Sequence, residues 1–253
     1  MNVDQYLSRI GIPNRPQPTV DALKALQRSH LMAVPYENLD ILAGVPLSLE
    51  PGALQNKIVA RRRGGYCFEL NELFGRLLRG LGYGVTDYFA RFLRDSDEIP
   101  MCRHHVLGVA VPGQPDRYLV DVGVGNGSPI EPVRLVEGVE QRQGDETYRM
   151  ARRPFLGWVL EEQKRGAWRA VFSFVEQPQL PVDFAAASFY CERSPDSPFG
   201  REPMLAIRTP AGRRTLDGET FKEFDRGEVR VLPPEGAEAR ARRIRDWFGI
   251  ETN

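Results

Sequence analysis

The first part of the chain, up to residue 83, carries its apolar residues at helical spacing. In the segment 67–81 they fall four, seven, eight and eleven positions after Leu70, the pattern of a helix with one face in a core. Three shorter helices are predicted before it: one over 3–10, one N-capped by Thr19, and one that Pro51 opens at its first position. We therefore expect a bundle of four helices.

From residue 84 onward the pattern changes to short runs rich in β-branched and aromatic residues. The runs HVLGVAV (105–111) and RYLVDVGV (117–124) are joined by PGQPD, which predicts a hairpin. Further strands are expected at 84–93, 147–152, 157–163 and 167–177. Together these strands predict a small antiparallel sheet or barrel over 84–178.

The last part of the chain mixes the two patterns. A helix is expected over 182–190 and another over 235–249. Strands are expected between them, at 204–209, 213–218 and 228–233. The whole pattern predicts an α+β protein, with helices first, then a sheet, then a smaller α/β part.

Size, charge and cysteine content narrow the class of protein. The 253 residues suit one large domain or two to three small ones. Lys plus Arg equals Asp plus Glu, at 34 each, so the basic excess typical of nucleic-acid or membrane binding is missing. The first residues lack a signal-peptide layout, and no apolar stretch approaches the ~18 residues that span a bilayer. Three widely spaced cysteines without a CxxC pair indicate a reduced, cytoplasmic protein.

Residues 64–67, Gly-Gly-Tyr-Cys, lead directly into the fourth predicted helix. The glycines allow tight or left-handed backbone and a close approach to a ligand. A thiol in the first turn of a helix lies at the positive end of the helix dipole, which favours the thiolate. Cys67 is therefore a candidate nucleophile; the alternative is a buried structural thiol.

The chain holds only three histidines, which limits the choice of a base for that nucleophile. His30 lies at the end of a predicted helix and could simply cap it. His104 and His105 are adjacent in a predicted strand, so only one of them can face a given cleft. The sister strand ends in Asp121, which the hairpin brings back toward the histidine pair. Cys, His and Asp are the types that form a nucleophile, a base and a group that orients the base.

The same residues also fit structural or metal-binding roles. Asp121 could merely begin the turn DVGVG, and either histidine could be an ordinary polar residue at a strand start. Cys102, His104 and His105 are close enough to suggest a metal site. However, this spacing puts ligands on both faces of a strand and has no matching second pair, so we expect no metal.

The segment RGGYCFELN (63–71) resembles the nucleophile motif of the arylamine N-acetyltransferases, Arg-Gly-Gly-x-Cys-x-Glu-x-Asn. VPYENLD (34–40) is similar to the family's Pro-aromatic-Glu-Asn-Leu motif, and YLVDVGVG (118–125) to its Asp-Val-Gly-Phe-Gly motif. Shorter similarities lie at 132–135 and 248–250. The resemblance implies an α+β fold with an N-terminal helical bundle, a central antiparallel β-barrel and a C-terminal α/β lid. We assign these to 1–83, 84–190 and 191–253.

The resemblance also implies a ping-pong N-acyltransferase with a Cys-His-Asp triad. By position, Cys67 corresponds to the acyl-accepting nucleophile and Asp121 to the triad aspartate. The family pattern of His, one variable residue and an aliphatic run fits His104 as the base, with His105 as the alternative register. An acyl thioester, acetyl-CoA, would be the co-substrate and an arylamine the acceptor, with no bound cofactor. Residues implied at the substrate pocket are Tyr36, Gly123, Val124 and Gly125.

Two departures from the family pattern keep a second substrate class open. Val124 stands where the family usually has Phe, and Asn126 where it has Gly; the chain is also short at its C-terminal end. These features are similar to the related amide synthases, which close ansamycin-type macrolactams from a thioester on an acyl carrier protein. That alternative predicts a wide, apolar channel at Val124. A thiol hydrolase, a transglutaminase-like enzyme and a catalytically silent binding module are further alternatives.

Overall fold

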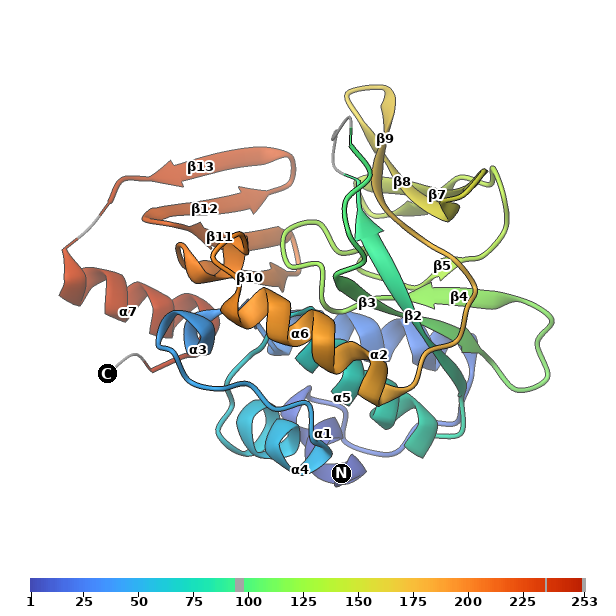
Figure 1. Cartoon of the computed structure of the whole chain (residues 1–253), viewed down its shortest axis with the longest axis horizontal. Helices are drawn as coiled ribbons and strands as arrows, with labels where there is room; N and C mark the ends of the chain where they lie inside the picture. The colour runs from blue at the N-terminus through green and yellow to red at the C-terminus, as the bar shows by residue number, and fades with distance from the viewer. Residues whose placement is uncertain (94–97, 235, 252–253) are drawn as a thin grey trace.

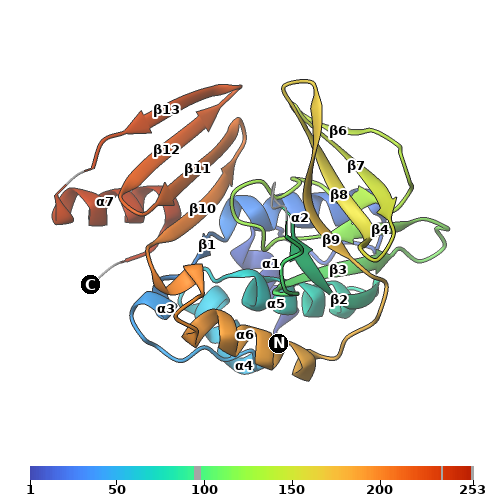
Figure 2. The ribbon, with the colours of Figure 1, turned by 45° about the horizontal axis from the view of Figure 1, so that its top comes forward.

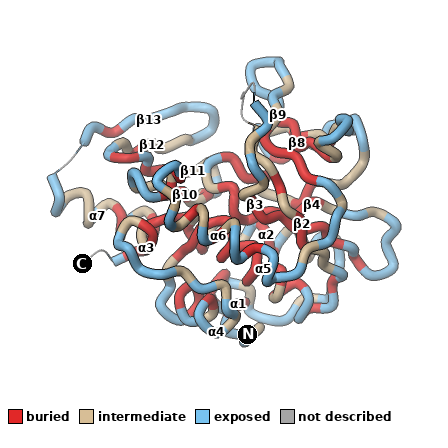
Figure 3. Tube along the Cα trace, viewed as in Figure 1, coloured by how far each residue is buried: buried red, intermediate tan, exposed pale blue. Residues whose placement is uncertain are grey.

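The computed structural model describes residues 1–93, 98–234 and 236–251. Helices from the first part of the chain form the base of the molecule, with two antiparallel sheets standing on them (Figures 1 and 2). Buried positions concentrate in α5 (Cys67–Gly80) and in the strands that pack on it, while the outer turns are exposed (Figure 3). None of the helices in these described ranges is long and apolar enough to cross a membrane.

The N-terminal helices follow the predicted pattern. Thr19 caps α2 by accepting a hydrogen bond from the Ala22 N–H, at 3.2 Å, and Pro51 opens α4. The leucines and the phenylalanine of the predicted stripe are buried in one core with residues of the other helices. The elements are α1 (Val3–Arg9), α2 (Val20–Ala33), α3 (Leu39–Leu42), α4 (Pro51–Leu54), a π-helical turn (Gln55–Ala60) and α5.

The central sheet is antiparallel and nearly closes into a barrel. Its order is β5-β4-β3-β2-β9-β8-β7-β6, so its two edge strands follow each other in the chain. The strands are β2 (Gly84–Phe92), β3 (His104–Ala110), β4 (Arg117–Val120), β5 (Val133–Arg134), β6 (Gln141–Gln143), β7 (Glu146–Arg153), β8 (Gly157–Lys164) and β9 (Ala167–Phe174). The predicted hairpin is β3–β4, with Leu107 opposite Val120.

Two glutamine side chains of β6 close the gap between the edge strands. The Gln141 amide accepts from the Arg134 N–H at 2.7 Å and donates to the Arg134 carbonyl at 2.9 Å. Gln143 does the same for Glu131, at 2.9 and 3.0 Å. Each primary amide therefore pairs with the edge backbone as a neighbouring strand would.

The C-terminal sheet has the order β1-β10-β11-β12-β13, and α7 packs against it. Its first strand, β1 (Tyr36–Glu37), comes from the N-terminal part of the chain and pairs with β10 (Met204–Thr209). The other elements are α6 (Phe184–Arg193), β11 (Gly212–Asp217), β12 (Thr220–Asp225), β13 (Glu228–Leu232) and α7 (Ala237–Phe248), with 3-10 turns at Pro181–Asp183 and Pro198–Gly200.

The α+β class with helices, barrel and C-terminal sheet with helix is confirmed. The expected helix 235–249 corresponds to α7; residue 235 itself lies outside the described residues. The division at 190/191 falls inside α6, and the domain limits stay a prediction. The short elements α3, β1, β5 and β6, and the strand β12, were not predicted. Among these strands, β1 pairs with the distant β10, and β5 and β6 are only two and three residues long, too short for a periodic signal.

Candidate active site

Cys67 is the first residue of α5, and the turn before it is held by the protein itself. The Tyr66 N–H donates to Glu69 Oε2 at 3.1 Å, which satisfies one of the free N–H groups at the helix start. A Cβ added to Gly64 would lie 2.0 Å from the Pro35 carbonyl oxygen. The glycine pair therefore permits a close approach of two backbone segments, and neither glycine has a positive φ.

The Cys67 thiol is 1% exposed, and its electrostatics differ from the sequence-based expectation. Burial raises the pKa of the thiol well above its usual range, and the nearby Cys191 and Asp121 raise it further. Backbone N–H groups of His105 and Phe68 lie against the sulfur and lower the pKa. Desolvation therefore opposes formation of the thiolate more strongly than these dipoles favour it.

The hairpin β3–β4 places His104 beside Asp121. His104 Nε2 donates to Asp121 Oδ2 at 2.6 Å, since a carboxylate can only accept; both residues are buried. The other ring nitrogen, His104 Nδ1, is buried and has no hydrogen-bond partner within the described chain. In the neutral imidazole this nitrogen is an acceptor, so it can take up a proton.

Asn71, which was not predicted as a site residue, joins the helix to both strands. Its Nδ2 donates to Asp121 Oδ1 at 2.9 Å and to the His105 carbonyl at 2.7 Å, while its Oδ1 accepts from the Val122 N–H at 3.0 Å. A signal was present in the sequence: Asn71 lies four residues after Cys67, hence on the same face of the helix. Because that face of the helix is buried, a polar side chain on it needs hydrogen-bond partners inside the protein.

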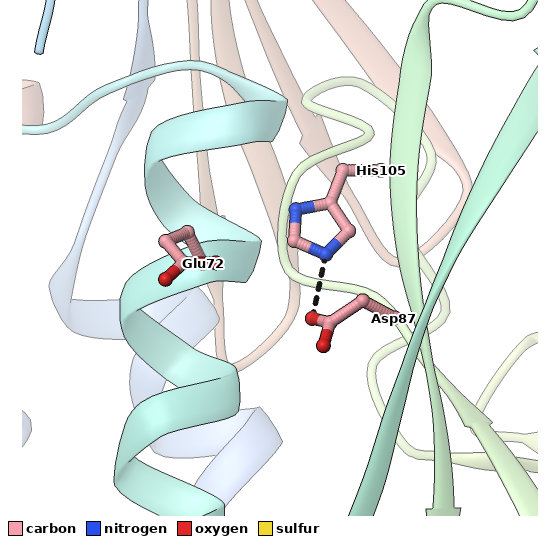
Figure 4. Close-up of side chains that lie close together, drawn as sticks. All are labelled: Glu72, Asp87 and His105. Carbon is pink, nitrogen blue, oxygen red and sulfur yellow. Dashed lines mark hydrogen bonds and ion pairs between the residues drawn. The ribbon is translucent and has the colours of Figure 1, made fainter. Parts of the chain in front are cut away.

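His105 points to the opposite side of β3 and meets a different carboxylate. His105 Nε2 donates to Asp87 Oδ1 at 2.9 Å, and its ring stacks on Phe184 with centroids 4.1 Å apart. Glu72 on α5 lies nearby, so three potential metal ligands gather within 4.8 Å (Figure 4).

Both carboxylates of this cluster already have cationic partners. Glu72 accepts from Arg76 Nε at 2.6 Å, and Asp87 pairs with Arg79. A metal ion would therefore have to displace two guanidinium groups, and the arrangement is better described as a compensated ion-pair network.

A pocket of about 240 Å³ lies between the barrel and the C-terminal sheet, next to Cys67 and His104. Two residues of the pocket or its wall contact the buried His104 and Cys67. The Phe92 ring packs on His104 with centroids 4.5 Å apart, and the Arg103 carbonyl oxygen lies 4.0 Å from Cys67 Sγ. The lining residues are Tyr36, Phe92, Arg103, Val124, Asn126, Pro198, Phe199, Met204, Leu205, Ala206 and Asp217.

The four residues expected at the substrate pocket take different places. Tyr36 and Val124 line it. Gly123 packs against the candidate nucleophile: a Cβ there would lie 2.6 Å from Cys67 Cα. Gly125 has φ +72 and faces the Tyr36 ring, which a Cβ would approach to 3.0 Å. The two glycines therefore shape the pocket from behind its wall.

The C-terminal side of the pocket is fastened by Asn38, from the motif at 34–40. Its Nδ2 donates to the carbonyls of Phe199 and Glu202, at 2.7 and 2.9 Å, and its Oδ1 accepts from the Met204 N–H at 2.8 Å. The side chain of Asn38, near the start of the chain, thus positions residues 199–204, which lie in the C-terminal part of the chain and contribute to the pocket wall.

Comparisons with known proteins agree with the motifs. A family model described as N-acetyltransferase matches residues 19–253. The arylamine N-acetyltransferase of Mycolicibacterium smegmatis is 36% identical, with 99% of this chain and 92% of the relative covered.

Solved structures of two further relatives are similar throughout. The arylamine N-acetyltransferase of Mycobacterium tuberculosis has a TM-score of 0.94 and 36% identity, and covers 99% of this chain and 93% of its own. The enzyme of Mycobacterium marinum, solved in complex with CoA, has a TM-score of 0.93 and 37% identity, with 98% and 93% covered. The chain described here therefore belongs to the arylamine N-acetyltransferase family.

Proposed function

We propose that this chain transfers an acetyl group from acetyl-CoA, through Cys67, to an arylamine and so forms an amide. The observation that supports this most directly is the 2.6 Å contact of His104 Nε2 with Asp121 Oδ2, beside a cysteine at a helix start. The relatives compared above are arylamine N-acetyltransferases, and the Mycobacterium marinum structure contains CoA. The three cysteines are free thiols, which fits the reducing, cytoplasmic location that we propose.

In the first half-reaction, His104 Nδ1 takes the proton of the Cys67 thiol as the sulfur attacks the thioester carbonyl. A new C–S bond forms, the bond to the CoA sulfur breaks, and the CoA thiolate leaves with the proton from His104. Asp121 stabilises the imidazolium that exists in between and holds Nε2 protonated. The N–H groups of Phe68 and His105 stabilise negative charge on the Cys67 sulfur.

In the second half-reaction, the amine attacks the acetyl-Cys67 thioester. His104 Nδ1 accepts the proton that the amine loses, and the Cys67 sulfur leaves and is reprotonated. Because burial raises the pKa of Cys67, transfer of its proton to His104 assists the attack of the sulfur.

The amide-synthase alternative calls for a wide channel at Val124. The pocket that Val124 lines measures about 240 Å³, below the roughly 300–1,000 Å³ of typical small-molecule sites. An acetyl group and a one-ring amine suit this size better than a long polyketide. The observations therefore favour the acetyltransferase.

Intact-protein mass spectrometry after brief incubation with acetyl-CoA tests the proposal. We expect a single acetyl adduct on the wild type that disappears when aniline is added. Cys67→Ala should form no adduct, whereas Cys102→Ala and Cys191→Ala, the matched controls, should still form it. If acetyl-CoA leaves the wild type unlabelled while a long-chain acyl thioester labels Cys67, the acetyltransferase proposal is wrong and the amide synthase replaces it.

A further inference from the structure

A cationic residue lies in the wall of the pocket, directly before the proposed base in the chain. Arg103 precedes His104 in the chain and lines the pocket together with Tyr36, Phe92 and Phe199. The residue is half-buried, and its charge acts on the nearby Cys191 thiol, whose pKa burial raises and this charge lowers.

This guanidinium has no anionic partner among the described residues. The hydrogen-bond contacts of Arg103 with that part of the chain are made by its backbone: the N–H donates to the Ala90 carbonyl at 3.2 Å, and the carbonyl oxygen faces Cys67. Asp217 also lines the pocket, yet the two form no ion pair in the described chain. By contrast, the buried Arg208 is paired with a carboxylate at 2.7 Å.

A guanidinium in a partly apolar cleft attracts anions more strongly than one in water does. Its planar, five-donor fork matches a carboxylate through two parallel hydrogen bonds. The Arg103 carbonyl oxygen lies 4.0 Å from Cys67 Sγ, so the same residue contacts the sulfur and lines the pocket. A substrate whose reacting atom reaches the sulfur brings its other groups into range of Arg103.

We infer that Arg103 is a specificity-determining residue that selects substrates bearing a carboxylate near the reacting centre. The inference rests on the proposed acetyltransfer, whose substrate class it narrows. The carboxylate can belong to the acceptor, as in an aminobenzoate, or to the acyl group, as in a dicarboxylic acyl-CoA. The shared chemistry is a carboxylate held by the guanidinium, and the test separates the two sources.

The acceptor arm compares 4-aminobenzoate with the uncharged 4-methylaniline, using acetyl-CoA as donor. Each substrate is measured with wild type, Arg103→Met and Arg103→Lys, so that differences in amine reactivity cancel in the ratios. A carboxylate on the acceptor predicts that Arg103→Met lowers kcat/KM for 4-aminobenzoate about tenfold, mainly through KM, and changes 4-methylaniline by less than about twofold. Arg103→Lys should retain part of the preference, because it keeps the charge but not the fork.

The acyl arm compares succinyl-CoA with acetyl-CoA, using aniline as acceptor. A carboxylate on the acyl group predicts that Arg103→Met selectively lowers the rate at which succinyl-CoA acylates Cys67. The matched control is Arg91→Met. Arg91 is also half-buried but lines a separate cavity of about 250 Å³, where it donates to the Pro100 carbonyl at 2.7 Å. Arg91→Met should change neither the preference for 4-aminobenzoate nor the rate of acylation by succinyl-CoA.

The inference is overturned if Arg103→Met changes charged and uncharged substrates equally in both arms. An equal change would mean that Arg103 only supports the strand that carries His104. Failure of the proposed function looks different: acetyl-CoA would then leave Cys67 of the wild type unlabelled in the mass spectrum, whatever residue stands at position 103.

Discussion

At the scale of single residues, the candidate active site depends on backbone contacts as much as on side chains. The segment after Asp121 passes directly over the helix start, and the Gly123 N–H donates to Asp121 Oδ1 at 2.8 Å. With the bonds from Asn71 and His104, both carboxylate oxygens are occupied. The carboxylate is therefore fixed in orientation before any substrate arrives.

Gly123→Ala tests this close packing. The added Cβ would lie 2.6 Å from Cys67 Cα and 2.8 Å from Asn71 Nδ2, so the loop or the helix start must shift. Because displacements of about 1 Å cost on the order of 100-fold in rate, we expect kcat to fall by about that factor. Steady-state kinetics with aniline provide the measurement. Gly52→Ala, where a Cβ meets nothing within 4 Å, should leave kcat unchanged. Equal kcat values for both variants would contradict the prediction.

A second residue-scale prediction concerns His30, which is buried in the helical bundle with Nδ1 2.8 Å from the Tyr6 hydroxyl. Burial, with a smaller contribution from Arg9, lowers the pKa of His30 from 6.5 to about 3. The unfolded chain therefore binds the proton first as the pH falls below 6.5, and stability is lost with acidification. Between pH 7 and pH 5 this amounts to about 2 kcal/mol.

His30→Phe should remove this part of the pH dependence while keeping an aromatic ring in the core. Urea unfolding at pH 7 and pH 5 measures it, as the difference between the variant and the wild type. The pKa of Glu69, raised by burial to about 7, has the opposite sign: its contribution is lost as the pH rises through 7. Because Glu69 is present in both proteins, its contribution cancels in the difference between the variant and the wild type. A variant that loses as much stability as the wild type on acidification would refute the assignment.

At the scale of elements, the barrel is closed by side chains where its strands are too short. β5 and β6 contain two and three residues, and the amides of Gln141 and Gln143 replace the missing ladder bonds. Such elements have almost no periodic signal, which explains why they were not predicted. The longer strands, with alternating or apolar runs, were predicted from the sequence.

Gln141→Ala should show how much this closure contributes. It leaves the Arg134 N–H and carbonyl without their partners, and we expect the free energy of unfolding to fall by about 1–3 kcal/mol. Urea denaturation measures the change. Gln163→Ala, on the exposed end of β8, is the control and should stay within about 0.5 kcal/mol of the wild type. Similar losses in both variants would mean that Gln141 does not close the barrel.

At the scale of the whole molecule, the pocket lies where the barrel and the C-terminal sheet meet. Arg208 of β10 is 7% exposed and crosses to Glu146 of β7, with bonds of 3.0 and 2.7 Å. This pair joins the two sheets near the pocket. The shape of the substrate site therefore depends on contacts between segments far apart in the sequence.

Arg208→Met should remove the shortest ion pair of the mostly buried Glu146 carboxylate, leaving it the 3.5 Å contact with Arg213 and the Tyr148 hydroxyl. We expect a loss of about 3 kcal/mol in the free energy of unfolding, together with a raised KM for the arylamine. Adding Glu146→Gln should recover part of the stability, because the uncompensated charge is then removed. Thermal and urea unfolding of the two variants give the answer; a double variant no more stable than Arg208→Met would contradict it.

The sequence by itself determined the helices other than α3, most of the longer strands, the β3–β4 hairpin and the family, because periodicity, caps and short motifs act over neighbouring residues. Strand alternation also showed that His104 and His105 face opposite sides. Only the tertiary structure decided which of them meets Asp121, since the competing partner, Asp87, is brought in by a different strand. The same holds for the raised pKa of the Cys67 thiol, because burial comes from the packing of the whole molecule around it.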